Sequence, residues 1–311
     1  MTTTIVTMFF NLKKLKDQTS STRPIEFYIE NAVHILKLKY PMVIFCDEDT
    51  KDLLKEMRDK QVGNSAPTEY IVKNLSDYDY YKHNWEIIRK NREQIFTNFD
   101  NRNTPSYFLM GMFKPLALWI ARQKNFFNTK YYAWMDIGCN HIVKELDKYA
   151  PIMLNNPKDK ITVCYIHYRS HDELKDMKEY MKHGGPCAIA STVYTVEDIY
   201  VEKFYCLMFT IFFEKILIGV GHTDETVMAY CYDRVPSIFN LYYGDYQSTV
   251  ANYHEPVMDL INIYAFLITN ALKKRRIDLA KDASKKILDS VEKNFIQFPL
   301  INNLKRILNE F

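Results

Sequence analysis

The first 136 residues alternate between short apolar segments and amphipathic segments, and this rhythm constrains the fold more than any other feature. Apolar runs rich in β-branched and aromatic residues predict strands at residues 5–10, 42–46, 69–72 and 131–135. Segments with the apolar periodicity of helices lie between them, at residues 25–38, 50–58, 85–96 and 105–125. Strands and helices that alternate roughly every 30 residues predict βαβ units and a mostly parallel sheet.

After residue 136 the alternation becomes less regular. Further strands are expected at residues 161–166, 188–193 and 238–243, helices at 196–217 and 224–232, and a turn at 183–186. From Val257 to the C-terminus the pattern is helical, with a break at Pro299. We predict an α/β protein with a mixed, mostly parallel sheet, flanked by helices and followed by a helical C-terminal tail. The predicted domains are residues 1–255 and an extension, residues 256–311, packed on the first domain.

The composition is that of an ordinary globular protein. Hydrophobic residues make up 47% of the 311 residues and charged residues 25%, so a sizeable core can form. The net charge of +3 is too small to indicate a nucleic acid or an anionic membrane as partner. One basic run, residues 273–276, is followed by Asp278 and Asp282, which favours a solvated helix face over a nucleic-acid site.

Targeting signals and disulfide patterns are not evident in the sequence. The N-terminus, MTTTIVTMFF, lacks the basic segment and cleavage site of a signal peptide. The longest apolar run, residues 204–220, is interrupted by Glu214 and Lys215, which argues against a membrane span. None of the six cysteines lies in a C-x-x-C pair, so buried free thiols in a reducing compartment are expected. These features predict a cytoplasmic protein.

The strand at residues 131–135 ends in an acid, Asp136, and a glycine follows at Gly138. Ligands of open α/β sheets bind beyond the carboxyl ends of the strands, which is where Asp136 would lie. A carboxylate there can ligate a hard cation or accept hydrogen bonds from a ribose, and Gly138 would let a diphosphate approach the backbone. The alternative is that Asp136 only caps the following turn.

Three other places carry candidate functional residues. Lys114 lies in an apolar stretch of helix, where it either binds phosphates as a point charge or extends to the surface. Asp224 and Glu225 follow glycines at 219 and 221 and begin a helix, so they either act on a ligand or cap that helix. The acidic run at residues 47–49 either touches a nucleotide or is a solvated loop. The motifs of P-loop, zinc-protease and dinucleotide-binding proteins are absent.

In this order the segments resemble nucleotide-sugar glycosyltransferases of the GT-A fold and, more closely, the HtrL/YibB family. The resemblance spans roughly residues 1–255. It rests on TIVTMFFNL in the first strand, the Trp134–Gly138 block WMDIG, the acidic segment TDET at residues 223–226 and the segment YGDY at 243–246. The sequence departs from the glycosyltransferase metal motif at Gly138, where a second Asp would be expected.

The resemblance implies a site. Asp136, with His254 near the end of the first domain, would hold Mn²⁺ or Mg²⁺, although His254 is equally expected as an ordinary loop residue. The nucleotide-sugar donor, with uridine as the default base, would contact these predicted donor-binding residues: Thr7, Phe9, Asn11, Lys114, Asp136 and Gly138. Asp224 and Glu225 would face the acceptor, as a general base or as an orienting group. A flexible turn at residues 184–185 would also face the acceptor.

The sequence therefore predicts a metal-assisted glycosyltransferase that moves a sugar from a nucleotide-sugar to the hydroxyl of a glycan or protein. One alternative is a catalytically inactive protein of this fold that binds nucleotide or glycan, which the departure at Gly138 favours. The other alternative is a scaffold that binds a partner through the amphipathic tail. Neither a nucleic-acid partner nor a membrane span is expected, and the oligomeric state is left open.

Overall fold

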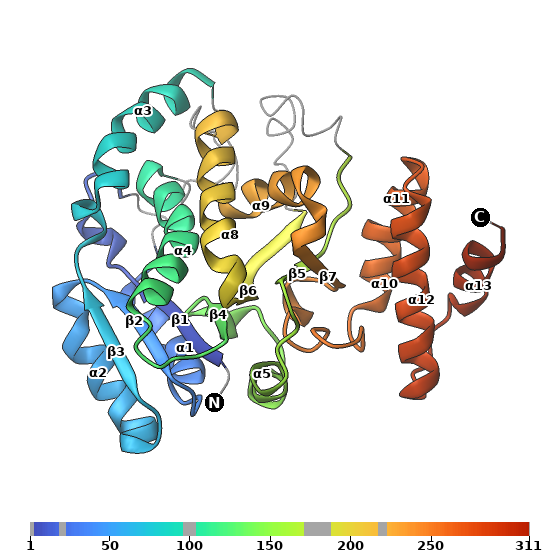
Figure 1. The fold of residues 1–311 in the computed structure, drawn as a ribbon, viewed down its shortest axis with the longest axis horizontal. Helices are drawn as coiled ribbons and strands as arrows, with labels where there is room; N and C mark the ends of the chain where they lie inside the picture. The colour runs from blue at the N-terminus through green and yellow to red at the C-terminus, as the bar shows by residue number, and fades with distance from the viewer. Residues whose placement is uncertain (1–2, 19–22, 96–103, 171–187, 217–222, 311) are drawn as a thin grey trace.

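A seven-stranded sheet runs through the centre of the molecule (Figure 1), in a computed structural model that describes residues 3–18, 23–95, 104–170, 188–216 and 223–310. The strands are β1 (Thr3–Phe9), β2 (Met42–Cys46), β3 (Thr68–Val72), β4 (Tyr131–Met135), β5 (Ile161–Tyr165), β6 (Ile189–Glu197) and β7 (Phe239–Tyr243). Their order in the sheet is β3-β2-β1-β4-β6-β5-β7. Strand β6 is antiparallel to both of its neighbours, and the other pairs are parallel.

Helices cover both faces of the sheet. Residues of α1 (Ile25–Leu36), α2 (Glu48–Val62) and α5 (Leu146–Asn155) share one core cluster with the sheet. Residues of α3 (Asp79–Ile95), α4 (Pro105–Lys124), α8 (Asp198–Ile211) and α9 (Thr223–Arg234) share the other. The chain ends in α10 (Leu260–Asn262), α11 (Thr269–Lys273), α12 (Ile277–Lys293) and α13 (Ile301–Glu310). The predicted fold class, a mixed and mostly parallel sheet with flanking helices and a helical tail, is confirmed.

The strands are buried on both faces because helices cover both sides. Every residue of β1, β2 and β5 is buried, as expected for strands that lie inside a parallel sheet. Along β1 the side chains alternate, with Val6 and Met8 in one core cluster and Ile5 and Phe9 in the other. Strand β1 lies between β2 and β4, so the carboxyl ends of these three strands meet at one edge of the sheet.

The reversed strand β6 brings a different part of the chain to the same edge. Met135, the last residue of β4, pairs with Val193, and the backbone N–H of Asp136 donates to the carbonyl of Thr192 at 2.9 Å. Because β6 is antiparallel, its first residues lie beside the carboxyl end of β4. Ser191 and Asp136 therefore become neighbours although 55 residues separate them in the sequence.

Several predicted helix boundaries were wrong, and the structure explains the changes at α2 and α8. Helix α2 extends to Val62 because Arg58, a charged residue that interrupts the apolar pattern, is buried and donates to the carbonyls of Leu36 and Leu38. Helix α3 begins at Asp79 rather than near residue 85. Helix α8 begins at Asp198 because β6 continues to Glu197, which pairs with Tyr131. The predicted turn at residues 183–186 lies outside the described residues.

The C-terminal helices pack beside β7, at the right of Figure 1. Tyr243 of β7 donates its hydroxyl hydrogen to Asp282 of α12 at 2.5 Å, and Lys286 donates to the carbonyl of Leu241 at 3.3 Å. Leu279 and other apolar residues of α12 belong to the same core cluster as α9. The division into two domains at residue 255 remains a prediction.

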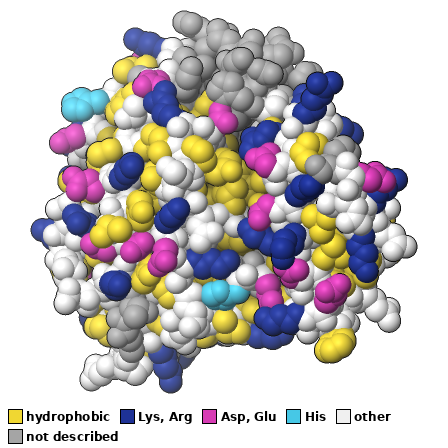
Figure 2. All heavy atoms as spheres, turned by 45° about the vertical axis from the view of Figure 1, so that its right-hand side comes forward, with side chains coloured by type: hydrophobic (Ala, Val, Ile, Leu, Met, Phe, Trp, Pro, Cys, Tyr) yellow, Lys and Arg dark blue, Asp and Glu magenta, His cyan; other side chains and the backbone are white. Residues whose placement is uncertain are grey.

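The surface and the thiols can be compared with the sequence. On the face in Figure 2, Lys and Arg side chains lie among Asp and Glu side chains around a hollow where hydrophobic side chains are visible, so the described residues there form no extended surface of one charge. Among the helices that the structure describes, none is both long and apolar enough to cross a membrane.

Free thiols at Cys46, Cys139, Cys164 and Cys231 are buried, but Cys206 is exposed. Cys187 lies outside the described residues.

Candidate active site

A cavity of about 440 Å³ opens where the carboxyl ends of β1 and β4 meet the amino end of β6. Its volume lies within the range of small-molecule sites in proteins. The cavity is lined by seven of the residues that the sequence singled out: Phe9, Asn11, Lys114, Asp136, Gly138, Asp224 and Glu225. Thr7 and His254 do not line it.

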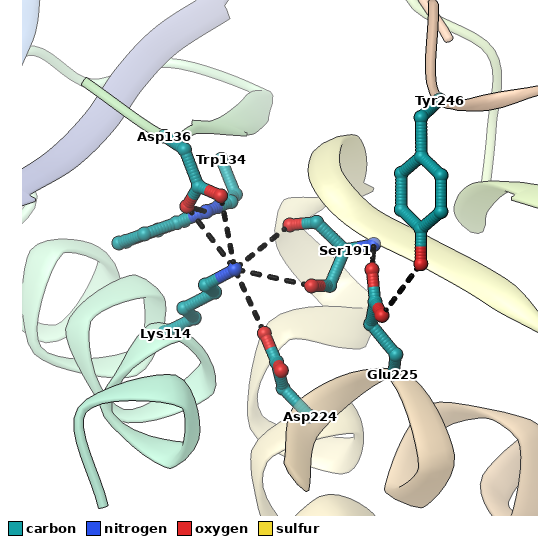
Figure 3. A network of polar contacts seen from close by, with 7 residues as sticks. All are labelled: Lys114, Trp134, Asp136, Ser191, Asp224, Glu225 and Tyr246. Carbon is teal, nitrogen blue, oxygen red and sulfur yellow. Dashed lines mark hydrogen bonds and ion pairs between the residues drawn. The ribbon is translucent and has the colours of Figure 1, made fainter. Parts of the chain in front are cut away.

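Lys114 of α4 lies between two carboxylates (Figure 3). Its Nζ is 3.1 Å from Oδ1 and 3.2 Å from Oδ2 of Asp136, and 2.8 Å from Oδ2 of Asp224. The carbonyl oxygen and Oγ of Ser191 lie 3.2 Å and 3.1 Å from the same nitrogen. An ammonium has three N–H groups, so these five oxygens already satisfy it. The Lys114 side chain is only 9% exposed, which makes it a fixed part of the cavity wall.

The pKa values follow from burial and from these charges. Burial works against the Lys114 ammonium, but the charges of Asp136 and Asp224 outweigh it and hold the pKa of Lys114 above its ordinary value. Burial also opposes the ionised form of Asp224, yet contact with Lys114 lowers the pKa of Asp224 below its ordinary value. The pKa of Asp136 is raised, because burial and the nearby charge of Asp224 outweigh the contact with Lys114. The ionised form is therefore more strongly favoured at Asp224 than at Asp136.

Glu225 is held by two other groups. Its Oε1 accepts the backbone N–H of Ser191 at 3.2 Å, and its Oε2 accepts the hydroxyl hydrogen of Tyr246 at 2.8 Å. Ser191 thus joins the two parts of the site, since its carbonyl and hydroxyl contact Lys114 while its N–H contacts Glu225. The first turn of α9 points Asp224 and Glu225 at different neighbours, so the two acids have different environments.

Three residues of this network were not among the predicted site residues. Trp134 donates its indole N–H to Oδ1 of Asp136 at 2.8 Å, as residues two apart on a strand share one face. Tyr246 belongs to the YGDY segment, whose Asp245 instead caps a short helical turn and accepts from Asn262. Trp134 and Tyr246 could have been found from the motifs, but Ser191 has no signal in the sequence.

The structure does not bring His254 near Asp136. The hydroxyl of the preceding Tyr253 accepts the backbone N–H of Lys158 at 2.7 Å and lies 2.6 Å from Oγ1 of Thr195. Lys158 comes before β5 and Thr195 pairs with the first half of β5, so His254 lies at the amino ends of the parallel strands. Asp136 follows the carboxyl end of β4, at the opposite edge of the sheet.

The described residues do not fit a resident divalent cation. Among residues 3–18, 23–95, 104–170, 188–216 and 223–310, no group of three or more His, Cys, Asp or Glu side chains is arranged to hold a metal. Both oxygens of Asp136 contact Lys114, and the position between Asp136 and Asp224 is taken by the ammonium. The cation that neutralises these carboxylates is supplied by the chain itself.

Two further predicted residues support the first strand. Thr7 is fully buried in β1 and does not reach the cavity. Asp47 is buried and accepts the backbone N–H of Asn11 at 2.5 Å, which fixes the segment after β1. Burial raises the pKa of Asp47. Glu48 and Asp49 are exposed, so only the first acid of this run has a structural role near the cavity.

The fold and the site define an α/β protein with a ligand-sized cavity at the carboxyl edge of its sheet. Residues 1–253 match the model of the HtrL_YibB family, described as bacterial protein of unknown function, and the chain belongs to that family. The family resemblance seen in the sequence is thereby confirmed. None of the proteins with curated descriptions matches the chain.

Solved structures with similar folds are distant in sequence. Core-mannan synthase A from Aspergillus fumigatus, in its Mn/GDP form, has 11% identity and a TM-score of 0.47, with 78% of this chain and 72% of that chain covered. Mouse xyloside xylosyltransferase 1 has 8% identity and a TM-score of 0.40, with coverage of 78% and 85%. The 4-diphosphocytidyl-2C-methyl-D-erythritol synthase from Anaerococcus prevotii has 10% identity and a TM-score of 0.35, with coverage of 88% and 98%.

Proposed function

We propose that this chain is a glycosyltransferase that moves a sugar from a nucleotide-sugar donor to an acceptor hydroxyl. The observation that most supports the proposal is Glu225, a carboxylate in the cavity wall that Tyr246 and the amide of Ser191 hold in one orientation. A cavity at the carboxyl edge of an α/β sheet is the usual place for a nucleotide. The resemblance of the Trp134–Gly138 block to nucleotide-sugar enzymes also supports a nucleotide-sugar as the ligand.

The proposed reaction needs one group near the acceptor. The acceptor oxygen forms a bond to the anomeric carbon, the bond from that carbon to the phosphate oxygen breaks, and its electron pair leaves with the nucleoside diphosphate. In an inverting reaction the hydroxyl proton passes to a general base. In a retaining reaction the carboxylate orients the acceptor and the proton passes to the leaving phosphate.

Glu225 is the better candidate for this group than Asp224. A carboxylate whose pKa is lowered by a close ammonium is a weak base, and Asp224 is in that position beside Lys114. Glu225 is not paired with Lys114 and is oriented by neutral donors, the Ser191 amide and the Tyr246 hydroxyl. We therefore assign the acceptor-facing role to Glu225 and a positioning role, through Lys114, to Asp224.

No step of the proposed reaction passes through a metal, because the donor set of the described residues does not fit one. The expected role of Asp136 with Mn²⁺ or Mg²⁺ can still be tested by binding. If Asp136 holds a cation together with the donor phosphates, Mn²⁺ strengthens nucleoside diphosphate binding and Asp136→Asn removes the gain. Equal affinity of UDP, GDP and CDP with and without Mn²⁺ would reject this metal role and leave the transfer reaction intact.

The test of the function compares the wild type with one amide variant, Glu225→Gln. Turnover of a set of nucleotide-sugars is measured as the release of nucleoside diphosphate. Water serves as the acceptor where no other acceptor is known. Glu225→Gln is expected to lower kcat by about 10²- to 10⁴-fold and to leave nucleotide affinity nearly unchanged. Full turnover in Glu225→Gln would refute the assignment, and a wild type that binds no nucleotide would refute the function.

A second candidate is an inactive protein of this fold that binds nucleotide. It is favoured by the departure at Gly138 from the glycosyltransferase metal motif. Binding of a nucleoside diphosphate without turnover of any nucleotide-sugar would select this alternative.

A further inference from the structure

A second charged feature of the cavity lies away from the carboxylates. The segment between β1 and α1 contributes Lys13 and Arg23 to the cavity wall. Within the part of the chain that the structure describes, neither side chain forms an ion pair, whereas Lys114 contacts two carboxylates. Lys13 is exposed, but Arg23 is half-buried. The contact between Arg23 and His141 is itself exposed, so the guanidinium stays accessible to a ligand in the cavity.

Arg23 is held in place by a histidine of fixed tautomer. Nδ1 of His141 lies 2.5 Å from the carbonyl oxygen of Gly138, and a carbonyl only accepts, so Nδ1 carries the hydrogen. Nε2 of the same ring lies 3.1 Å from Nη1 of Arg23, and a guanidinium only donates, so Nε2 is the acceptor. His141 is thus neutral in this arrangement. It links Arg23 to the turn that follows Asp136.

An aromatic ring completes the support of Arg23. The guanidinium carbon lies 4.6 Å from the centre of the Phe27 ring, a cation–π contact, and His141 packs edge-on against the same ring with centroids 5.1 Å apart. These contacts use one of the five N–H groups of the guanidinium. The rest of this planar donor set has no carboxylate partner among the described residues, and the planar fork of arginine matches the oxygens of phosphate.

We propose that Arg23, positioned by His141 and Phe27, binds the phosphate groups of the ligand in this cavity. This inference rests on the proposed function where it takes that ligand to be a nucleoside diphosphate. It also reassigns the phosphate contact that the sequence attributed to Lys114, since the five oxygens around Lys114 leave no N–H for a phosphate. Arg23 recognises the anion, and the Lys114 cluster holds the carboxylates.

The test measures what the phosphates contribute. Calorimetric titrations compare each nucleoside with its diphosphate, for uridine, guanosine and cytidine, and inorganic pyrophosphate serves as a probe without a base. In the wild type the diphosphate is expected to bind more tightly than the nucleoside. Arg23→Gln should lower diphosphate and pyrophosphate affinity by about 10- to 100-fold, the effect of losing hydrogen bonds to a charged group, and leave nucleoside affinity within about twofold.

Further variants separate positioning from folding. His141→Ala should lower the same diphosphate-to-nucleoside ratio by a smaller factor, because Arg23 remains but loses its support. Arg23→Lys keeps the charge without the fork and should give an intermediate ratio, which also serves if Arg23→Gln does not fold. Arg122→Gln is the matched control, since Arg122 is a partly exposed arginine that pairs with Asp198 away from the cavity lining. It should leave the ratio unchanged.

The outcomes distinguish this inference from the proposed function. An unchanged ratio in Arg23→Gln and Arg23→Lys, with nucleotide binding retained, overturns the role of Arg23 and leaves the proposed function standing. Pyrophosphate binding that depends on Arg23, without any nucleotide binding, supports the anion site. It overturns the proposal that the ligand is a nucleoside diphosphate. A wild type that binds none of these probes overturns both.

Discussion

Replacing Lys114 by Met is the most informative change in this protein, because it removes the ammonium between Asp136 and Asp224 while nearly keeping the side-chain volume. The variant leaves two carboxylates facing each other across the position of the ammonium. Two hydrogen bonds of the network do not involve Lys114 and can remain: from the Trp134 indole to Asp136, and from the Ser191 amide to Glu225. We expect a folded protein of clearly lower stability at neutral pH.

The size of the loss can be estimated from burial. Removing one partner of a buried ion pair costs about 3–5 kcal/mol, because the other charge is left uncompensated. Lys114 and Asp224 are 9% and 11% exposed, so their contact has that character, whereas Asp136 is 34% exposed and solvent screens its share. We therefore expect a loss near the lower limit, about 3 kcal/mol. At about 2 °C per kcal/mol, the low end for longer chains, Tm should fall by roughly 6 °C.

The loss should depend on pH with a definite sign. Without Lys114, mutual repulsion and burial raise the pKa of both carboxyl groups in the folded variant, so the penalty is full at pH 7 and shrinks as the pH falls. In the wild type the pKa of Asp224 is lowered, so the stability it contributes is present at neutral pH and is lost in acid. The pKa of Lys114 is raised above 10.5, so its contribution is complete below that value. Between pH 7 and pH 4 the wild type keeps most of this stability, so protonation of the two carboxyl groups in the variant is what narrows the difference.

The assay is thermal unfolding of both proteins between pH 4 and pH 9. Lys124→Met, an exposed lysine in the last turn of the same helix, is the matched control and should cost less than about 1 kcal/mol. Adding Asp224→Asn to Lys114→Met removes the repulsion and should recover part of the lost Tm. A Lys114→Met protein as stable as the Lys124→Met control at pH 7, or a Tm difference that does not change with pH, would refute the ion-pair reasoning.

Three further outcomes are expected. Tyr246→Phe removes the hydroxyl that donates to Glu225, so turnover should fall by about 10- to 100-fold while nucleotide affinity stays the same, as measured by steady-state kinetics and titration. Gly138→Ala places a Cβ 3.1 Å from Cδ1 of Tyr28, so Tm should fall by the equivalent of about 1–2 kcal/mol, and combination with Tyr28→Ala should cost less than the sum of the single changes. Among the described cysteines, Cys206 should react first with a maleimide in the folded protein, which peptide mass spectrometry can check, because it is the exposed thiol.

Much of the fold follows from local sequence patterns. Strands β1, β2 and β4 are short, apolar and bounded by polar residues, so their positions could be predicted to within two residues. The placement of Asp136 at the carboxyl edge also follows, because it needs only the direction of β4 and the rule for ligand sites in α/β sheets. Helix α2 was predicted too short, since a buried arginine looks like a surface residue when its carbonyl partners are unknown.

The arrangement within the site could not be predicted, because it depends on which strand is reversed. Ser191 reaches Lys114 and Glu225 only because β6 is antiparallel to β4, and no residue of β6 signals that direction. The position of His254 in the sequence likewise does not determine at which edge of the sheet it lies. The pairing of Lys114 with Asp224, 110 positions apart, is a property of the packed helices α4 and α9 and not of either segment alone.

The central position of β1 has a consequence for the order in which the protein can fold during synthesis. Strand β1 finds its first neighbour in β2, which begins at Met42, but its other neighbour is β4, which begins at Tyr131. At typical rates of translation, about 5–20 residues per second, the apolar edge of β1 stays without its second partner for several seconds after β2 has been made. We expect nascent chains that stop before β4 to bind chaperones or to be cleaved by added protease, and chains that extend beyond β6 to be protected. The centre of the sheet is therefore the last part of these four strands to close, although β1 precedes β2, β3 and β4 in the sequence.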